Sequence, residues 1–359
     1  MIVLDSHCDT PSQIQRLRNV CIRNRHGHVD FPRMKEGGVD ASFFALYVSP
    51  SYKREEATVQ ALNLLDGVLD SVRRSQGAAV LALTPEDAVT NKSLGRLSVF
   101  LGIENGSAIQ DSMDLLHGFH DKGVRYMTLC HSADNLICDS CASKVKTWGG
   151  LSPFGRDVIR KMNNLGMMVD VSHISDDSFY DVLEVSTKPV VATHSCCRAL
   201  SDHPRNMTDE MIVALAKNGG VIQINFYPVF LDASFAKELS SSGIIEEGEK
   251  IEAEFIADPS DENKRSAWYE IVEKLKKLPR PSYRKIVDHI DHVVRLVGIN
   301  HVGIGSDFDG IDVTPQGMED ITDVPKIFEE MRLRGYSEED ISKVAGGNFL
   351  RVMSICQSL

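Results

Sequence analysis

Residues 166–195 read "GMMVDVSHISDDSFYDVLEVSTKPVVATHS", two short apolar runs on either side of a helical pattern. The runs at 166–173 and 188–195 have the length and apolar content of strands buried on both faces, and each contains a histidine near its end. Residues 175–186 between them place apolar side chains at helical spacing. A strand, a helix and a second strand in this order form a parallel pair, so the segment predicts an α/β fold.

The same unit recurs along the chain. Six further runs are strand candidates, namely 1–7, 39–48, 97–104, 124–131, 219–227 and 301–310. Helical patterns lie between most of them, including 55–74 and a segment with Ser152 as N-cap, Pro153 in the first turn and Gly166 at its end. Eight alternating strands and helices predict a (β/α)8 TIM barrel of the metal-dependent hydrolase type. A doubly wound open sheet is the alternative, but no glycine-rich phosphate loop follows the first strand.

Length and composition fit one large domain. The chain has 359 residues, of which 42% are hydrophobic and 25% charged, and α/β barrels often reach this size as a single unit, here 1–359. One segment, at about 232–282, is dense in Glu, Lys and Ser and lengthens the link before the last strand. We interpret it as an insertion of solvated helices on the barrel surface. The alternative is a lid or a dimer contact at the barrel mouth.

Charge and hydropathy exclude several classes of partner. The net charge of −12 argues against nucleic acid or an anionic membrane surface. No stretch approaches the roughly 20 apolar residues that cross a bilayer, and the first residues lack the pattern of a signal peptide. Eight cysteines without a zinc-ribbon spacing suit a reducing compartment. We therefore expect a cytoplasmic protein.

Polar side chains gather where the predicted strands end. In a barrel of this kind the functional residues lie at the carboxyl ends of the strands. Six strands end in histidines or carboxylates: His7, Asp9, Glu104, His131, His173, His194, Asp307 and Asp309. A single such residue is usually a capping or core side chain, but six strands place them at one mouth. The joint pattern predicts a functional centre.

Three imidazoles and two carboxylates form a ligand set for divalent metals. They suit Zn²⁺ and also Mn²⁺, Co²⁺ or Fe²⁺, and five ligands exceed the three of a usual catalytic zinc site. The five ligands fit two ions about 3.5–4 Å apart that share a water molecule, whose pKa they lower to about 7. His7 and Asp9 would hold one ion, His173 and His194 the other, and Glu104 would bridge.

Other residues near the strand ends have different predicted roles. Asp307 can take a proton from the attacking water and pass it to the leaving group, whereas Asp309 is interpreted as structural. His131 is a candidate donor to the developing oxyanion. Arg205, in "SDHPRNMTD", can clamp a substrate carboxylate, although a loop arginine alone is usually only solvated.

The motifs "DSHCDT", "LGIENG", "RYMTLCHSADN", "DVSHIS", "HPRNM" and "GIGSDFDG" extend nearly from end to end of the chain. In them the sequence resembles the membrane dipeptidase family (renal dipeptidase-like, peptidase family M19) of the amidohydrolase superfamily. The resemblance implies a binuclear zinc centre at the mouth of a (β/α)8 barrel that hydrolyses dipeptides. The metal ligands that it implies are His7, Asp9, Glu104, His173 and His194.

The resemblance also implies substrate contacts. The substrate-carbonyl histidine corresponds to His131, the carboxylate-binding arginine to Arg205 and the proton-shuttling aspartate to Asp307. Tyr227, which ends the motif "INFY", is a further substrate-binding candidate. Two departures leave the ligands in place but alter the pocket: many relatives have Asn at the position of Cys8, and often glycine after the bridging glutamate, where this chain has Asn105.

We therefore predict a metal-dependent dipeptidase in which hydroxide held by two divalent ions, zinc first, attacks the peptide carbonyl. The substrates are L-L dipeptides and, as in bacterial-type relatives, L-D dipeptides, and the family suggests a homodimer. Two alternatives stay open: a barrel metallohydrolase of another amide, ester or phosphoester, and a non-catalytic metal- or peptide-binding protein. Retention of all five ligands together with Asp307 argues against the last.

Overall fold

The computed structural model describes residues 1–358, and its centre is a ring of parallel strands. The main path of the sheet runs β1-β2-β4-β5-β6-β7-β8-β9. A parallel bridge between Cys8 and Phe308 brings its first and last members together. The strands are β1 (Leu4–Cys8), β2 (Ala41–Tyr47), β3 (Ala79–Leu81), β4 (Leu97–Glu104), β5 (Val124–Thr128), β6 (Met168–Asp170), β7 (Val191–Ser195), β8 (Val221–Ile224) and β9 (Val302–Ile304). This nearly closed ring confirms the predicted (β/α)8 TIM barrel.

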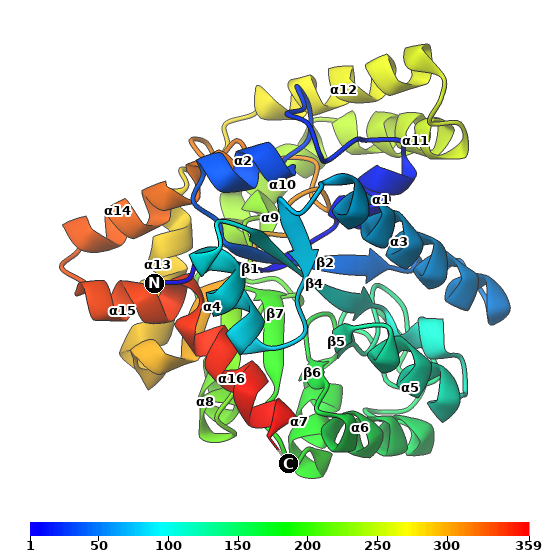
Figure 1. The fold of residues 1–359 in the computed structure, drawn as a ribbon, viewed down its shortest axis with the longest axis vertical. Helices are drawn as coiled ribbons and strands as arrows, with labels where there is room; N and C mark the ends of the chain where they lie inside the picture. The colour runs from blue at the N-terminus through cyan, green and yellow to red at the C-terminus, as the bar shows by residue number, and fades with distance from the viewer. Residues whose placement is uncertain (359) are drawn as a thin grey trace.

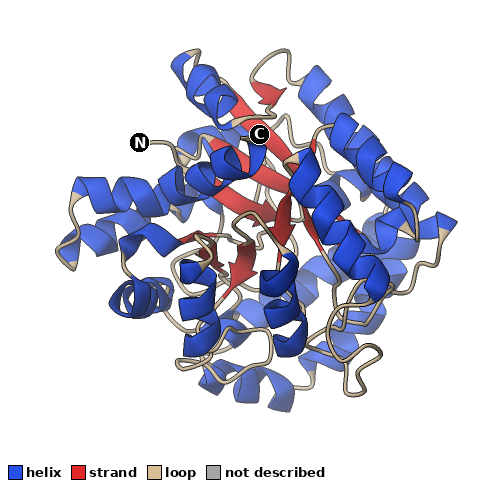
Figure 2. Cartoon of the chain, turned by 90° about the horizontal axis from the view of Figure 1, so that it is seen from below, coloured by secondary structure: helices blue, strands red, loops and turns tan. Residues whose placement is uncertain are grey.

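Helices surround the strands on the outside, as Figures 1 and 2 show. They are α1 (Thr10–Gln15), α2 (Phe31–Glu36), α3 (Glu55–Arg74), α4 (Pro85–Ser93), α5 (Met113–Asp121), α6 (Pro153–Leu165), α7 (Asp176–Val185), α8 (Asp209–Lys217), α9 (Pro228–Leu231), α10 (Ala233–Ser241), α11 (Ile244–Ala257), α12 (Glu262–Lys276), α13 (Arg284–Val297), α14 (Pro325–Leu333), α15 (Glu338–Ser342) and α16 (Asn348–Gln357). The helix predicted at 55–74 has the same bounds as α3.

The ends of α6 follow from local chemistry. The Ser152 hydroxyl accepts a hydrogen bond from the Gly155 amide, and Pro153 occupies the first helical position, where its missing amide hydrogen costs nothing. Gly166 ends the helix with a φ of 74°, a conformation that glycine adopts without strain. The predicted start and stop of this helix are confirmed.

Aromatic side chains fill the amino-terminal half of the barrel. The Phe43 ring lies 4.8 Å from that of Phe100 and 5.2 Å from those of Tyr126 and Phe349, centroid to centroid. Phe349 belongs to α16, so this helix packs into the same apolar cluster as the strands. Because this half is packed with apolar side chains, the polar residues at the carboxyl ends are left to form the site.

The charged segment predicted as an insertion forms α10, α11 and α12, of which α11 and α12 lie at the top of Figure 1. These helices have a small apolar core of their own, formed by Phe235, Leu239, Phe255, Trp268, Ile271 and Leu275 together with Val313. Side chains from α11 and α12 also line the cavity at the barrel mouth, among them Glu252 and Tyr269.

One strand of the sheet was not predicted. β3 pairs with β4 in parallel, beside the main path, and has only three residues, too few for a periodic pattern. No helix within residues 1–358 is both long enough and apolar enough to cross a membrane.

Candidate metal centre

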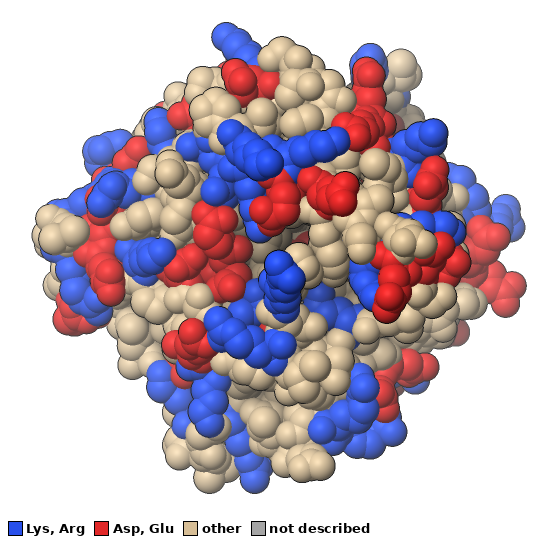
Figure 3. All heavy atoms as spheres, turned by 90° about the horizontal axis from the view of Figure 1, so that it is seen from above, with Lys and Arg blue, Asp and Glu red and all other residues tan. Residues whose placement is uncertain are grey.

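The carboxyl ends of the strands open into a cavity of about 720 Å³. Figure 3 shows the face seen from above, with a hollow at its centre bordered by both basic and acidic side chains. Seven of the predicted site residues line the cavity: Asp9, Glu104, His131, His173, Arg205, Tyr227 and Asp307. The other two, His7 and His194, are buried, within ion-pairing distance of Glu104.

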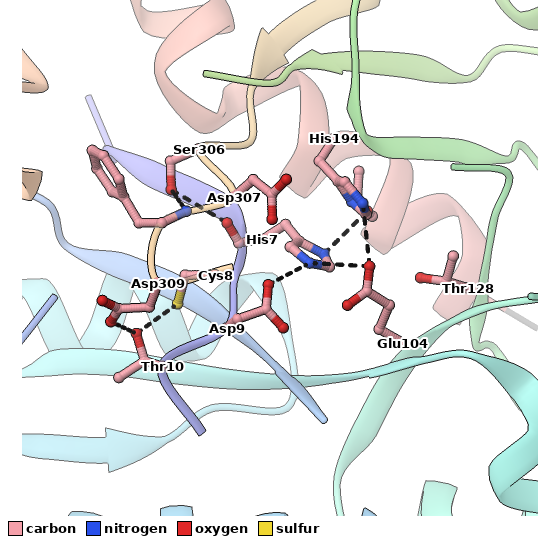
Figure 4. Close-up of polar contacts among 12 residues, drawn as sticks. His7, Cys8, Asp9, Thr10, Glu104, Thr128, His194, Ser306, Asp307 and Asp309 are labelled. Atoms are coloured by element: carbon pink, nitrogen blue, oxygen red, sulfur yellow. Dashed lines mark hydrogen bonds and ion pairs between the residues drawn. The ribbon is translucent and has the colours of Figure 1, made fainter. Parts of the chain in front are cut away.

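Glu104, the last residue of β4, is the focus of the cluster. Its Oε1 lies 3.1 Å from His173 Nε2, 3.3 Å from His194 Nε2 and 3.7 Å from His7 Nε2. The His131 Nε2 is 3.9 Å away. Figure 4 shows Glu104 turned toward both His7 and His194. One carboxylate oxygen is thus surrounded by imidazoles from four different strand ends.

A second group of ligand atoms adjoins the first. Asp9 Oδ2 lies 3.4 Å from His7 Nε2, and Asp307 joins these two residues in a group whose ligand atoms all lie within 4.8 Å of one another. His7, Glu104 and His194 form another such group, as do Glu104, His131 and His173. The three groups share His7 and Glu104, so they form one continuous cluster of candidate metal ligands.

The unsatisfied polar atoms at this centre fit bound cations. In the described part of the chain, His7 Nε2 and Asp9 Oδ1 are buried and have no hydrogen-bond partner. The Nε2 atoms of His173 and His194 lie 2.8 Å apart, so two ring nitrogens face each other. Buried polar atoms without partners are costly, and bound divalent cations would supply partners for these atoms. The donor set and its geometry therefore suit a metal.

The protonation states of these histidines and of Asp9 also favour a bound metal. Burial lowers the pKa of His173 and His194 well below the ordinary value, which keeps both imidazoles in the neutral form that binds metal. Burial and the charge of Glu104 raise the pKa of Asp9 to about 6. Burial opposes protonation of His7, but Glu104 and Asp9 raise its pKa well above the usual range. The cluster holds excess negative charge, which a cation would compensate in place of protons.

The backbone is unusual at three points of the centre. Asn105, His173 and Asp307 have φ values of 80°, 71° and 61°, a left-handed region that side chains other than glycine seldom adopt. Such conformations concentrate at functional sites, where the surrounding structure imposes them. The Asn105 side chain supports this turn by donating to the Val48 carbonyl and accepting from the Ser107 amide.

Three further residues orient the histidines and were missed in the sequence. The Tyr126 hydroxyl lies 2.9 Å from His7 Nδ1, and the Thr193 hydroxyl lies 2.8 Å from His194 Nδ1. Thr193 donates in turn to Asp170 Oδ2 at 2.7 Å. Partners of this kind fix the ring orientation of metal-binding histidines. Thr193 and Asp170 precede His194 and His173 in the motifs "ATHS" and "DVSH", which was the available signal.

Arg205 and His131 lie on the cavity wall beside the cluster. The Arg205 Nη2 donates to the His194 carbonyl at 2.9 Å, and in residues 1–358 its buried Nε has no partner. The guanidinium is therefore anchored on one side and keeps donors for a substrate. Burial, with the charges of Arg205 and His7, lowers the pKa of His131 to about 3, so this imidazole is neutral. A neutral imidazole can donate one hydrogen bond to a substrate oxygen.

The two aspartates after β9 have different surroundings. Asp307 Oδ2 accepts a hydrogen bond from Asn225 Nδ2 at 2.8 Å. Burial raises the pKa of Asp307 to about 7, with His7 opposing the shift and Asp9 adding to it. A carboxyl group of this kind can take up and release a proton near neutral pH. Asp309 instead accepts hydrogen bonds from Arg18 and Thr10, away from the histidines in Figure 4.

A barrel that gathers histidines and carboxylates at the carboxyl ends of its strands belongs to the class of metal-dependent hydrolases. Comparison with known proteins narrows this class. The family described as membrane dipeptidase (peptidase family M19) matches residues 1–359. The chain belongs to this family, so it is a metallopeptidase that hydrolyses peptide bonds.

Individual relatives agree with the family match. An uncharacterised dipeptidase of Schizosaccharomyces pombe is 30% identical, over 99% of this chain and 81% of that protein. Among solved structures, the probable dipeptidase PvdM from Pseudomonas aeruginosa has a TM-score of 0.85 and 27% identity, covering 99% of this chain and 96% of that one. A metallopeptidase from Rhodobacter sphaeroides, liganded with a phosphinate mimic of L-Ala-D-Ala, has a TM-score of 0.81 and 26% identity, covering 99% of each chain.

Proposed function

We propose that this chain is a binuclear metallodipeptidase that uses zinc. The side chains that would hold the two ions are those of His7, Asp9, Glu104, His173 and His194. The observation that carries the proposal is the position of Glu104 Oε1, within 3.7 Å of three imidazole nitrogens from separate strand ends. Asp9 Oδ2 lies 3.4 Å from His7 Nε2, so these two residues form one half of the ligand set.

Two bound cations would polarise the peptide carbonyl and lower the pKa of the attacking water. Asp307 has the protonation behaviour of the group that moves protons: it accepts one from the water and delivers it to the leaving amine. Asn225 orients this carboxylate through the hydrogen bond to Oδ2. His131, neutral and on the cavity wall, donates a hydrogen bond to the carbonyl oxygen as negative charge develops there.

The substrate is a dipeptide with a free carboxylate. Arg205 is held by the His194 carbonyl and directs its remaining donors at the cavity, where a carboxylate can accept two of them. Tyr227 lines the same cavity. We include both L-L and L-D dipeptides, because the similar metallopeptidase from Rhodobacter sphaeroides is liganded with a mimic of L-Ala-D-Ala.

The test combines metal content with activity. We expect close to two zinc ions per chain by inductively coupled plasma mass spectrometry, and hydrolysis of L-L or L-D dipeptides that disappears on chelation and returns with zinc. Glu104→Ala should lose both metal and activity. Asp307→Ala should keep its metal and lose turnover by about 10²- to 10⁴-fold.

Three results would contradict the proposal. Metal-free protein with full activity would exclude the metal centre, and normal turnover by Asp307→Ala would exclude the proton-transfer role. Metal-dependent hydrolysis of other amides or esters without any dipeptide turnover would favour the alternative metallohydrolase.

A further inference from the structure

The cavity continues beyond the metal centre to a wall formed in part by the insertion. Asp312, in the loop after β9, lines this wall together with Arg16, Tyr227 and Glu252. The next residue, Val313, is buried in the apolar core of the inserted helices. Asp312 is therefore fixed in place by packing on one side, and its side chain keeps exposed surface.

Among the described residues, the Asp312 carboxylate has no partner of its own. Arg16, which lines the same wall, is already paired with Glu252, with Nη1 3.1 Å from Oε1. No hydrogen bond or ion pair within residues 1–358 reaches the Asp312 side chain. An uncompensated carboxylate thus faces the substrate cavity.

Asp312 lies away from the guanidinium that would bind the substrate carboxylate. Arg205 donates to the carbonyl of His194, at the ligand cluster, whereas Asp312 lines the cavity wall with Arg16 and Glu252. Asp312 is also outside the three groups of close ligand atoms found among the described residues. The α-ammonium of a dipeptide is two bonds from the scissile carbon and so stays at the metal centre. The more distant cation of a Lys or Arg side chain is therefore the better match for a carboxylate on the cavity wall.

We propose that Asp312 is a specificity-determining residue that binds the ammonium or guanidinium group of the side chain preceding the scissile bond. The enzyme then favours Lys-Xaa and Arg-Xaa dipeptides. This inference rests on the proposed dipeptidase function. The Arg16–Glu252 ion pair beside Asp312 forms the rest of this wall and leaves Asp312 as the available anion.

The test compares substrates that differ in one charge. We would measure kcat/KM of the zinc-loaded enzyme for Lys-Ala and for norleucine-Ala, whose side chain has similar length without charge. The expected ratio is about 10- to 100-fold in favour of Lys-Ala, as a hydrogen-bonded charge pair would give. Asp312→Asn should lower this ratio by a similar factor. The matched control is Glu249→Gln, which removes one charge at an exposed position of α11 outside the cavity lining and should keep the wild-type ratio.

A binding measurement separates this inference from the dipeptidase proposal. Calorimetry with Lys-Ala and norleucine-Ala on Asp307→Asn and on the double variant Asp307→Asn/Asp312→Asn reads the charge preference without turnover. A wild-type ratio near one, or the same ratio in Asp312→Asn, would overturn the inference. Equal losses of affinity for both dipeptides in the Asp312→Asn background would also overturn it, because they would assign Asp312 to the α-ammonium. A preference for Ala-Lys over Lys-Ala would overturn it as well, because it would place the contact on the carboxyl-terminal residue of the dipeptide.

Discussion

Removing the Asp309 carboxylate should destabilise the fold at neutral pH and much less in acid. Asp309 Oδ1 accepts hydrogen bonds from Arg18 Nη1 at 2.6 Å and from the His28 amide at 2.8 Å, and Oδ2 accepts one from the Thr10 hydroxyl at 2.9 Å. The three donor residues lie 281 to 299 positions before Asp309 in the sequence, so this carboxylate joins the loop after β9 to the first part of the chain.

The magnitude follows from the pKa. Burial alone would raise the pKa of Asp309, but Arg18, His28 and their hydrogen bonds lower it from 3.8 to about 2. Because the folded-state pKa lies below that of the unfolded chain, the stabilisation is present above about pH 4. It is lost as the pH falls from about 4 to about 2. A difference of nearly two pKa units corresponds to roughly 2 kcal/mol at pH 7.

The assay is urea denaturation between pH 7 and pH 3. The wild-type protein and Asp309→Asn are both first freed of metal with a chelator. We expect the variant to be less stable by about 2–4 kcal/mol at pH 7, since Arg18 also loses its partner. The difference should fall by about half near pH 3. Asp111→Asn, at an exposed loop position, is the control and should change stability little at either pH. A difference that stays constant or grows on acidification would refute the reasoning.

Three other substitutions probe the centre. Arg205→Lys should raise KM for dipeptides by about 10- to 100-fold but affect dipeptide amides much less, because a lysine cannot reproduce the paired donors; equal effects on both substrates would contradict the carboxylate contact. Tyr126→Phe should weaken zinc affinity by about 10- to 100-fold, measured by competition with a chelator, because His7 loses its hydroxyl partner. A Cβ at Gly310 would lie 2.2 Å from Asp9 Oδ2 and 2.6 Å from Asp307 Oδ1, so Gly310→Ala should fold but bind zinc poorly; wild-type zinc content would exclude this crowding.

The sequence predicted the barrel and the gathering of its site because both depend on periodic features. Each buried strand of the ring has its own apolar run, and the carboxyl ends of parallel strands meet at one edge, so Glu104 and His173 could be placed together without coordinates. Zinc, the homodimer and the cytoplasmic location stay predictions.

Other features depend on packing that a linear pattern does not contain. Tyr126 is an ordinary apolar-run residue until its hydroxyl is seen beside His7. The charged composition of the insertion suits both solvated helices and a cavity wall, and only the position of Glu252 beside Arg16 distinguishes them. Asp312 follows Asp307 in a loop already rich in acids, so its lack of a partner is visible only in three dimensions.

The aromatic packing around Phe43 and Phe349 prevents small molecules from passing through the amino-terminal half of the barrel. The dipeptide and both product amino acids must therefore enter and leave through the same opening, beside the inserted helices. If Arg205 binds the substrate carboxylate as proposed, a released amino acid bound there would block the next dipeptide, so the products would act as competitive inhibitors.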